Sequence, residues 1–216
     1  MISRINLFNY GEVGERLAGI RESEIHQQSA QKIARTINSF ENPLAKSFKT
    51  DANKINNQIL RSINKGDMTS SNLRNNERRI NSLSNYVSKI SQLDKIEGKT
   101  NRRFAKISDG LSGFSNIATQ QRAESISSNL SNRFNNIKPT NINGTTRALK
   151  SFNNELGNVE TQTKGLRKLD NLTNRLSAFE NNLKPRQINK YRKAIVDLSN
   201  AKDVGSGNYM GRLKAL

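Results

Sequence analysis

In this 216-residue chain, the residues whose types and spacing indicate a chemical role are short clusters of Lys and Arg. They comprise Arg78 and Arg79, Arg102 and Arg103, and, between residues 186 and 193, Arg186, Lys190 and Lys193. Guanidinium and ammonium groups spread along a surface neutralise phosphates, which gives salt-dependent binding to nucleic acid without sequence preference. We therefore predict that these residues contact double-stranded DNA through its phosphates. Two alternatives stay open: the same charges keep a polar protein in solution, or they face acidic proteins.

The residue types needed for catalysis or metal binding are missing or scattered. The chain has no Cys and a single His, His26, and its Asp and Glu residues stand singly among bases. This excludes disulfide frameworks, thiol chemistry and Cys- or His-based metal sites, and it leaves no paired carboxylates for acid–base chemistry. Gly98-Lys99-Thr100 resembles the end of a phosphate-binding loop, but the first glycine of that motif would fall on Leu93. We predict a non-enzymatic protein that needs no cofactor and no metal.

The net charge lies outside the first 42 residues. The chain carries 36 Lys and Arg against 18 Asp and Glu, which gives a formal charge of +18 and a pI near 10.5. Residues 1–42 hold five bases and five acids, so the whole excess belongs to residues 43–216. A strongly basic balance predicts attraction to polyanions. Aromatic residues make up only 6% of the chain and do not alternate with basic runs, which argues against stacking platforms for single strands.

The charge-neutral start of the chain carries an apolar cluster made of Ile5, Leu7, Phe8 and Tyr10. Asn6 and Asn9 interrupt this cluster, which is too short to be a core of its own or the apolar region of a secretory signal. Exposed, it would leave an apolar patch, so we predict that it docks on another protein chain. No apolar run approaches the ~20 residues that span a bilayer, and we predict no membrane span.

Apolar residues recur at steps of three and four along most of the chain, which is the period of an α-helix, and the alternation typical of strands is absent. The pattern predicts helices over about 12–39, 43–66 and 73–98, a less regular stretch over 100–137 that breaks near 108–113, and a short last helix over 188–198. Pro43 marks a helix start, and Gly66 and Gly98 mark helix ends. The predicted fold class is all-α: an elongated helical bundle of coiled-coil-like hairpins joined by short polar turns.

The strongest apolar stripe runs from Leu149 to Leu183 and predicts a helix of about 39 residues, roughly 58 Å long. The short helix after Pro185 cannot cover this stripe, so earlier helices or another subunit must, and we predict a homo-oligomer within a larger assembly. Residues 203–216 have no period and predict an irregular C-terminal tail. The expected organisation is a neutral docking segment and helix over 1–42, a basic helical body over 43–202 and a tail over 203–216.

A Cys-free, Asn- and Lys-rich helical chain with an apolar N-terminal tip and a basic body resembles in type the minor structural components of DNA virus and bacteriophage particles. The resemblance implies a non-enzymatic, oligomeric virion protein near the packaged DNA or the portal and tail vertex. One alternative is a nucleoid-type protein of the cytoplasm that binds DNA without sequence preference. The other is a helical adaptor or scaffold that makes no contact with nucleic acid.

Overall fold

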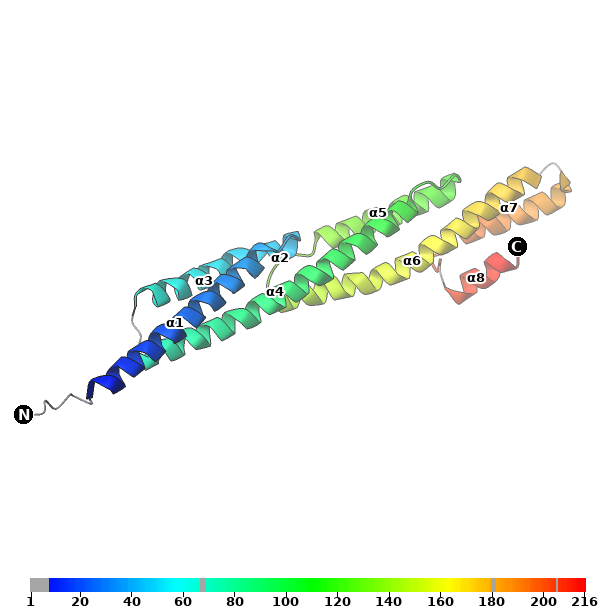
Figure 1. The fold of residues 1–216 in the computed structure, drawn as a ribbon. Helices are drawn as coiled ribbons and strands as arrows, with labels where there is room; N and C mark the ends of the chain where they lie inside the picture. The colour runs from blue at the N-terminus through cyan, green and yellow to red at the C-terminus, as the bar shows by residue number, and fades with distance from the viewer. Residues whose placement is uncertain (1–7, 67–68, 180–181, 205) are drawn as a thin grey trace, which may run out of the picture. The chain divides into compact units, whose positions relative to one another are not determined.

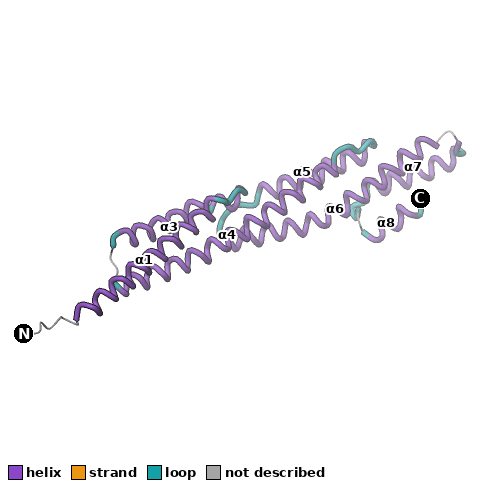
Figure 2. The backbone as a smooth tube through the Cα atoms, viewed as in Figure 1, coloured by secondary structure: helices purple, strands orange, loops and turns teal. Residues whose placement is uncertain are grey.

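The computed structural model describes residues 8–66, 69–179, 182–204 and 206–216, and the side chains from residue 12 onward. The described residues form helices α1 (Phe8–Asn38), α2 (Pro43–Ser47), α3 (Lys49–Asn64), α4 (Ser70–Leu111), α5 (Ile117–Asn135), α6 (Ile142–Phe179), α7 (Pro185–Ser199) and α8 (Gly207–Lys214) (Figure 1). Figure 2 shows only helices and connecting loops along the described chain. The predicted all-α helical bundle is confirmed.

The chain divides into two compact units. The first unit contains the described residues up to Glu97 together with Pro139–Ile142, and the second unit contains Gly98–Lys138 and Asn143–Leu216. Helix α4 therefore supplies residues to both units. These units are defined by contacts within the fold, whereas the predicted boundary at residue 42 is defined by charge. That predicted division stays a prediction.

The core of the first unit is built from α1, α3 and α4. Helix α1 packs against α3. Ile33 and Ile37 of α1, Ile59 and Ile63 of α3, and Leu83 of α4 are buried. The two isoleucines of α1, and likewise those of α3, are four residues apart and so share one face of their helix, which is the face that packing removes from water.

Two acidic side chains of α4 hold the start of α2. The Glu97 carboxylate is 1% exposed and accepts hydrogen bonds from the backbone N–H groups of Leu44 at 3.0 Å and Ala45 at 3.1 Å. Asp94 accepts a hydrogen bond from the N–H of Asn42 at 3.1 Å. Burial raises the pKa of Glu97, although the two backbone hydrogen bonds act in the opposite direction. These carboxylates satisfy N–H groups that have no partner within their own helix.

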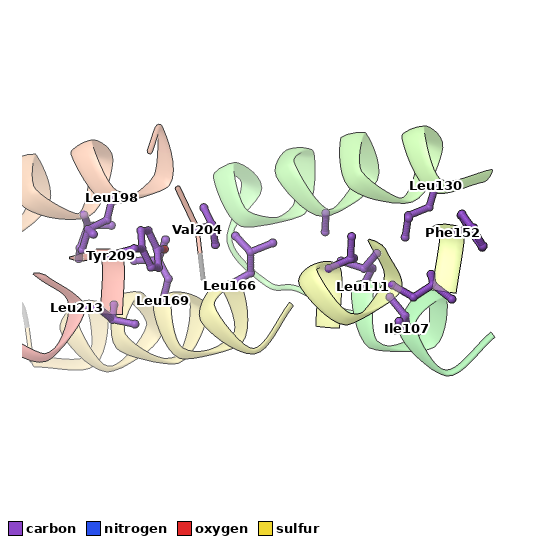
Figure 3. Close-up of a cluster of buried hydrophobic side chains, with 14 residues drawn as sticks. Ile107, Leu111, Leu130, Phe152, Leu166, Leu169, Leu198, Val204, Tyr209 and Leu213 are labelled. Carbon is purple, nitrogen blue, oxygen red and sulfur yellow. The ribbon is translucent and has the colours of Figure 1, made fainter. Parts of the chain in front are cut away.

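The core of the second unit lies along α6. Figure 3 shows Leu169 of α6 near Tyr209 and Leu213 of α8 and Leu198 of α7. Leu166 of α6 lies beside Val204, and all six side chains are buried. Further toward the start of α6, three phenylalanines from different helices pack together. Their ring centroids lie 5.3 to 6.0 Å apart, and they are Phe104 of α4, Phe134 of α5 and Phe152 of α6.

The apolar stripe of α6 is thus covered within the chain. Leu149, Leu156, Leu166 and Leu169 are fully buried, whereas Phe179 at the end of the helix is 55% exposed. The argument that this stripe requires another subunit therefore loses its basis. The homo-oligomer stays a prediction without that support.

The structure corrects the sequence-based elements at three places. Helix α4 continues through Gly98 because Glu97 and Thr100 are buried beside it, and such packing outweighs the ~1 kcal/mol by which Gly weakens a helix. The predicted helix 43–66 is divided at Phe48 into α2 and α3. The prediction of an irregular tail is wrong for Gly207–Lys214, because these residues form α8. The Ser206 hydroxyl caps the start of this helix by accepting from the N–H of Tyr209, and the Tyr209 side chain is fully buried.

Candidate nucleic-acid interface

The two arginines of each adjacent pair, Arg78–Arg79 and Arg102–Arg103, do not lie side by side on one face of α4. Successive residues of an α-helix project about 100° apart, so neighbours in sequence face different surroundings. Arg78 and Arg79 are both exposed on the part of α4 that belongs to the first unit. On the part that belongs to the second unit, Arg102 is exposed, whereas Arg103 is half-buried against α6. The side chains that meet are those spaced along a helix face or brought together from two helices.

A groove of about 600 Å³ lies between α4 and α6 in the second unit, and we call it the basic groove. Five cationic side chains line it, and they are Arg102, Arg103, Lys106, Lys164 and Arg167. Ile107, Gly110 and Thr163 complete the lining together with one carboxylate, Glu160. Two of the predicted contact residues, Arg102 and Arg103, therefore share a site with three bases that lie elsewhere in the sequence.

Arg103 is fixed across the groove by contacts with α6. Its Nη1 donates to the backbone carbonyl of Asn153 at 3.1 Å and to the side-chain oxygen of the same residue at 3.2 Å. Its Nη2 donates to Glu160 at 3.2 Å. A Cβ at Gly157 would lie 3.3 Å from Nη2, so this glycine in the middle of α6 leaves room for the guanidinium group. Arg103 therefore holds α4 and α6 together as well as lining the groove.

Arg167 is positioned in the same way from the other side. Its Nε and Nη2 donate to the carbonyl oxygen of Gly110 at 3.4 and 3.2 Å. Gly110 lies close to α6, since a Cβ there would meet the Thr163 side chain at 3.5 Å. The guanidinium group of Arg167 is thereby oriented at the groove while its side chain stays exposed.

The electrostatics of the basic groove favour an anion. The hydrogen bond from Arg103 and the charge of Lys164, 3.6 Å from the carboxylate, hold the pKa of Glu160 below its ordinary value. Glu160 is therefore ionised at neutral pH and offsets one of the five cations. Arg102, Lys106, Lys164 and Arg167 are all exposed. The groove offers four exposed cations to a polyanion, and arginine forks and lysine ammonium groups both bind phosphate oxygens.

A second basic surface lies on α7, also in the second unit. Arg186, Lys190 and Lys193 are exposed, and their spacing of four and three residues places them on one face of the helix over about 10 Å. Asp197 is the next residue on that face. The three predicted residues thus form a row on one face of α7, and Asp197 follows them at the end of that row.

Most of the charge excess belongs to the second unit. Its residues include 21 Lys and Arg against eight Asp and Glu, a net of +13, whereas the first unit has 15 bases and ten acids, a net of +5. Both basic surfaces described above belong to the more highly charged unit. A polyanion would accordingly be attracted mainly to the second unit.

The predicted docking residues lie at the start of the chain. Ile5 and Leu7 lie outside the described residues, and Phe8 and Tyr10 belong to α1 but their side chains lie outside the described part. Within the described residues no helix is long and apolar enough to cross a membrane. No group of three or more His, Asp or Glu side chains there could hold a metal ion.

Sequence reasoning missed Lys106, Lys164 and Arg167 because it searched for bases that adjoin in sequence. A partial signal exists, since Lys106 follows Arg102 by four residues and so shares its helix face. The pairing of α4 with α6 has no such signal in the chain. Comparisons with protein-family models, with curated proteins and with solved structures found no match.

Proposed function

We propose that this chain is a non-enzymatic structural protein of a DNA virus or bacteriophage particle that contacts packaged double-stranded DNA through its phosphates. The basic groove carries the DNA part of this proposal, because five cations from two helices converge there with a single compensating carboxylate. The exposed row on α7 provides further contacts from the same unit. Such contacts are independent of base sequence, as a protein that packs against a whole genome requires.

The virion part of the proposal rests on the resemblance in composition described above. A nucleoid-type protein would use the same groove in the same way, so the groove supports that alternative equally. The two differ in what the protein accompanies: a virion component co-purifies with particles at fixed stoichiometry, and a nucleoid-type protein co-purifies with cellular DNA.

The groove can be tested with a triple substitution, Arg102→Gln, Lys106→Gln and Lys164→Gln. These three side chains are exposed, and the arginines that bind backbone carbonyls across the groove, Arg103 and Arg167, are kept. We expect at least a tenfold loss of affinity for duplex DNA at low salt. The slope of log affinity against log salt should become shallower by about 2.7, because each phosphate contact contributes about 0.9.

The matched control removes three exposed bases of the first unit, Lys54→Gln, Lys65→Gln and Lys89→Gln, with the same change in net charge. We expect this variant to lose much less affinity than the groove variant in a fluorescence anisotropy titration. An equal loss in both variants would show that only the total charge matters and would contradict the assignment of the groove.

A further inference from the structure

Large exposed apolar side chains gather on the first half of α1. Val13 is 52% exposed, Leu17 is 61% exposed and Ile20 is 42% exposed. Their spacing of four and three residues places them on one face of the helix, which we call the α1 stripe. It is the spacing with which apolar residues follow the contact line between two paired helices.

The α1 stripe is separate from the face of α1 that packs inside the first unit. That inner face carries His26, Ala30, Ile33 and Ile37, all buried. At 100° per residue, the α1 stripe lies roughly a third of a turn around the helix from it. The three side chains are therefore outside the core of the first unit, and packing within that unit does not account for them.

Two arginines border the α1 stripe, one on each side. In the heptad register that puts Val13, Leu17 and Ile20 at the contact line, Arg16 and Arg21 take the two flanking positions. Both are exposed, and among the residues that the structure describes neither has an ion-pair partner. The edges of the stripe are thus positive on both sides.

These flanking charges disfavour a second copy of the same helix. A parallel pair would set Arg16 beside Arg21 of the other copy, and the antiparallel registers would set Arg16 beside Arg16 or Arg21 beside Arg21. Like charges at these positions destabilise helix pairs. A membrane surface is disfavoured too, because Glu12, Glu15 and Glu22 lie elsewhere around this part of α1 and Glu24 takes the contact-line position after Ile20.

We propose that the α1 stripe is a docking surface for an amphipathic helix of a partner protein whose apolar seam is flanked by acidic residues. Leucine-type side chains would cover Val13, Leu17 and Ile20, and carboxylates on both edges would pair with Arg16 and Arg21. This proposal concerns the first unit and does not depend on DNA binding by the second unit.

The probe is a synthetic helical peptide with Leu at the contact-line positions and Glu at the flanking positions, titrated into the full chain by fluorescence anisotropy. A second peptide has Lys at the flanking positions, and a third has the composition of the first in scrambled order. We expect the native chain to bind the acidic heptad peptide at least tenfold more tightly than either other peptide.

Two variants locate the binding. Leu17→Asp changes an exposed side chain and should weaken binding of the acidic peptide at least tenfold while the helical circular dichroism stays unchanged. The double variant Arg16→Glu and Arg21→Glu should reverse the preference, so that the Lys-flanked peptide binds better. The control Lys54→Glu and Lys65→Glu, which makes the same change in charge elsewhere on the first unit, should leave the preference as it was.

Other outcomes would overturn the proposal. Equal binding of the scrambled and heptad peptides, or binding that survives Leu17→Asp, would mean that the general positive charge of the chain attracts acidic peptides. A concentration-dependent dimer in analytical ultracentrifugation that Leu17→Asp abolishes would assign the α1 stripe to a second copy. Because DNA affinity should be unchanged in Leu17→Asp, failure here is distinguishable from failure of the DNA-binding proposal.

Discussion

Replacing Leu169 with Asp should unfold the second unit. Leu169 of α6 is fully buried, in the cluster that includes Leu198 of α7 and Tyr209 of α8. Removing a buried leucine side chain destabilises a protein by about 2–5 kcal/mol, and burying an unpaired carboxylate adds a further penalty. The sum is comparable to the whole stability of a typical domain, ~5–15 kcal/mol.

Phe179→Asp is the matched control, because it introduces the same charge on the same helix at a position that is 55% exposed. Urea unfolding followed by circular dichroism should show a large loss of stability for Leu169→Asp and a small one for Phe179→Asp. A Leu169→Asp variant with native stability would contradict the packing of α7 and α8 on α6.

The second large effect is expected at Asp170, which joins the α4–α5 loop to α6. One carboxylate oxygen accepts from the N–H of Asn116 at 2.9 Å and from the Thr119 hydroxyl at 2.8 Å. The other accepts from the Ser115 hydroxyl at 3.0 Å. Asp170 is only 7% exposed, and Asp170→Ala would remove the shared acceptor of the part-buried Asn116 N–H and of the Thr119 and Ser115 hydroxyls. We expect a loss of about 2–4 kcal/mol of unfolding free energy.

The contribution of Asp170 should depend on pH. Burial by itself would raise the pKa of Asp170, but hydrogen bonds from Asn116, Thr119 and Ser115 outweigh it and the pKa lies below its ordinary value. A carboxyl group with a lowered pKa in the folded state stabilises the fold above its unfolded-state pKa, near 3.9, and this stabilisation is lost as the pH falls through the folded-state value. The native chain and Asp170→Asn should accordingly differ most at neutral pH and converge in acid.

Urea midpoints measured at pH 7 and at stepwise lower pH test both expectations for Asp170. Asp197→Ala removes an exposed acid of the same unit and serves as the control, with little change expected. A midpoint for Asp170→Ala that equals the native one at pH 7 would show that the carboxylate does not hold the loop.

The helices of this chain were predictable from sequence because their apolar residues follow one period. The stripe predicted from Leu149 onward corresponds to α6, and Pro43 and Pro185 begin α2 and α7. The errors occur where local signals and packing disagree. Gly98 indicates a helix end, yet α4 continues through it because the neighbouring Glu97 and Thr100 are buried. Helix α8 is too short for its buried residues, Tyr209 and Leu213, to show a helical period in the sequence.

The candidate site was predictable only in part. Arg102 and Arg103 were identified by their adjacency, and Arg186, Lys190 and Lys193 by their density. Lys164 and Arg167 lie about 60 residues from Arg102 in the chain, and only the packing of α4 on α6 brings them to the same groove. The α1 stripe was missed because apolar residues in a helical period predict a core, and exposure becomes visible only in the fold.

The most direct test of the account is duplex DNA binding by the full chain, measured with two unrelated sequences from low to physiological salt. We expect binding at low salt with equal affinity for both sequences, and a slope of log affinity against log salt between about −4 and −6, since four exposed groove cations and three on α7 are available. Absence of binding at low salt would contradict the nucleic-acid interface and leave the helical adaptor as the better account.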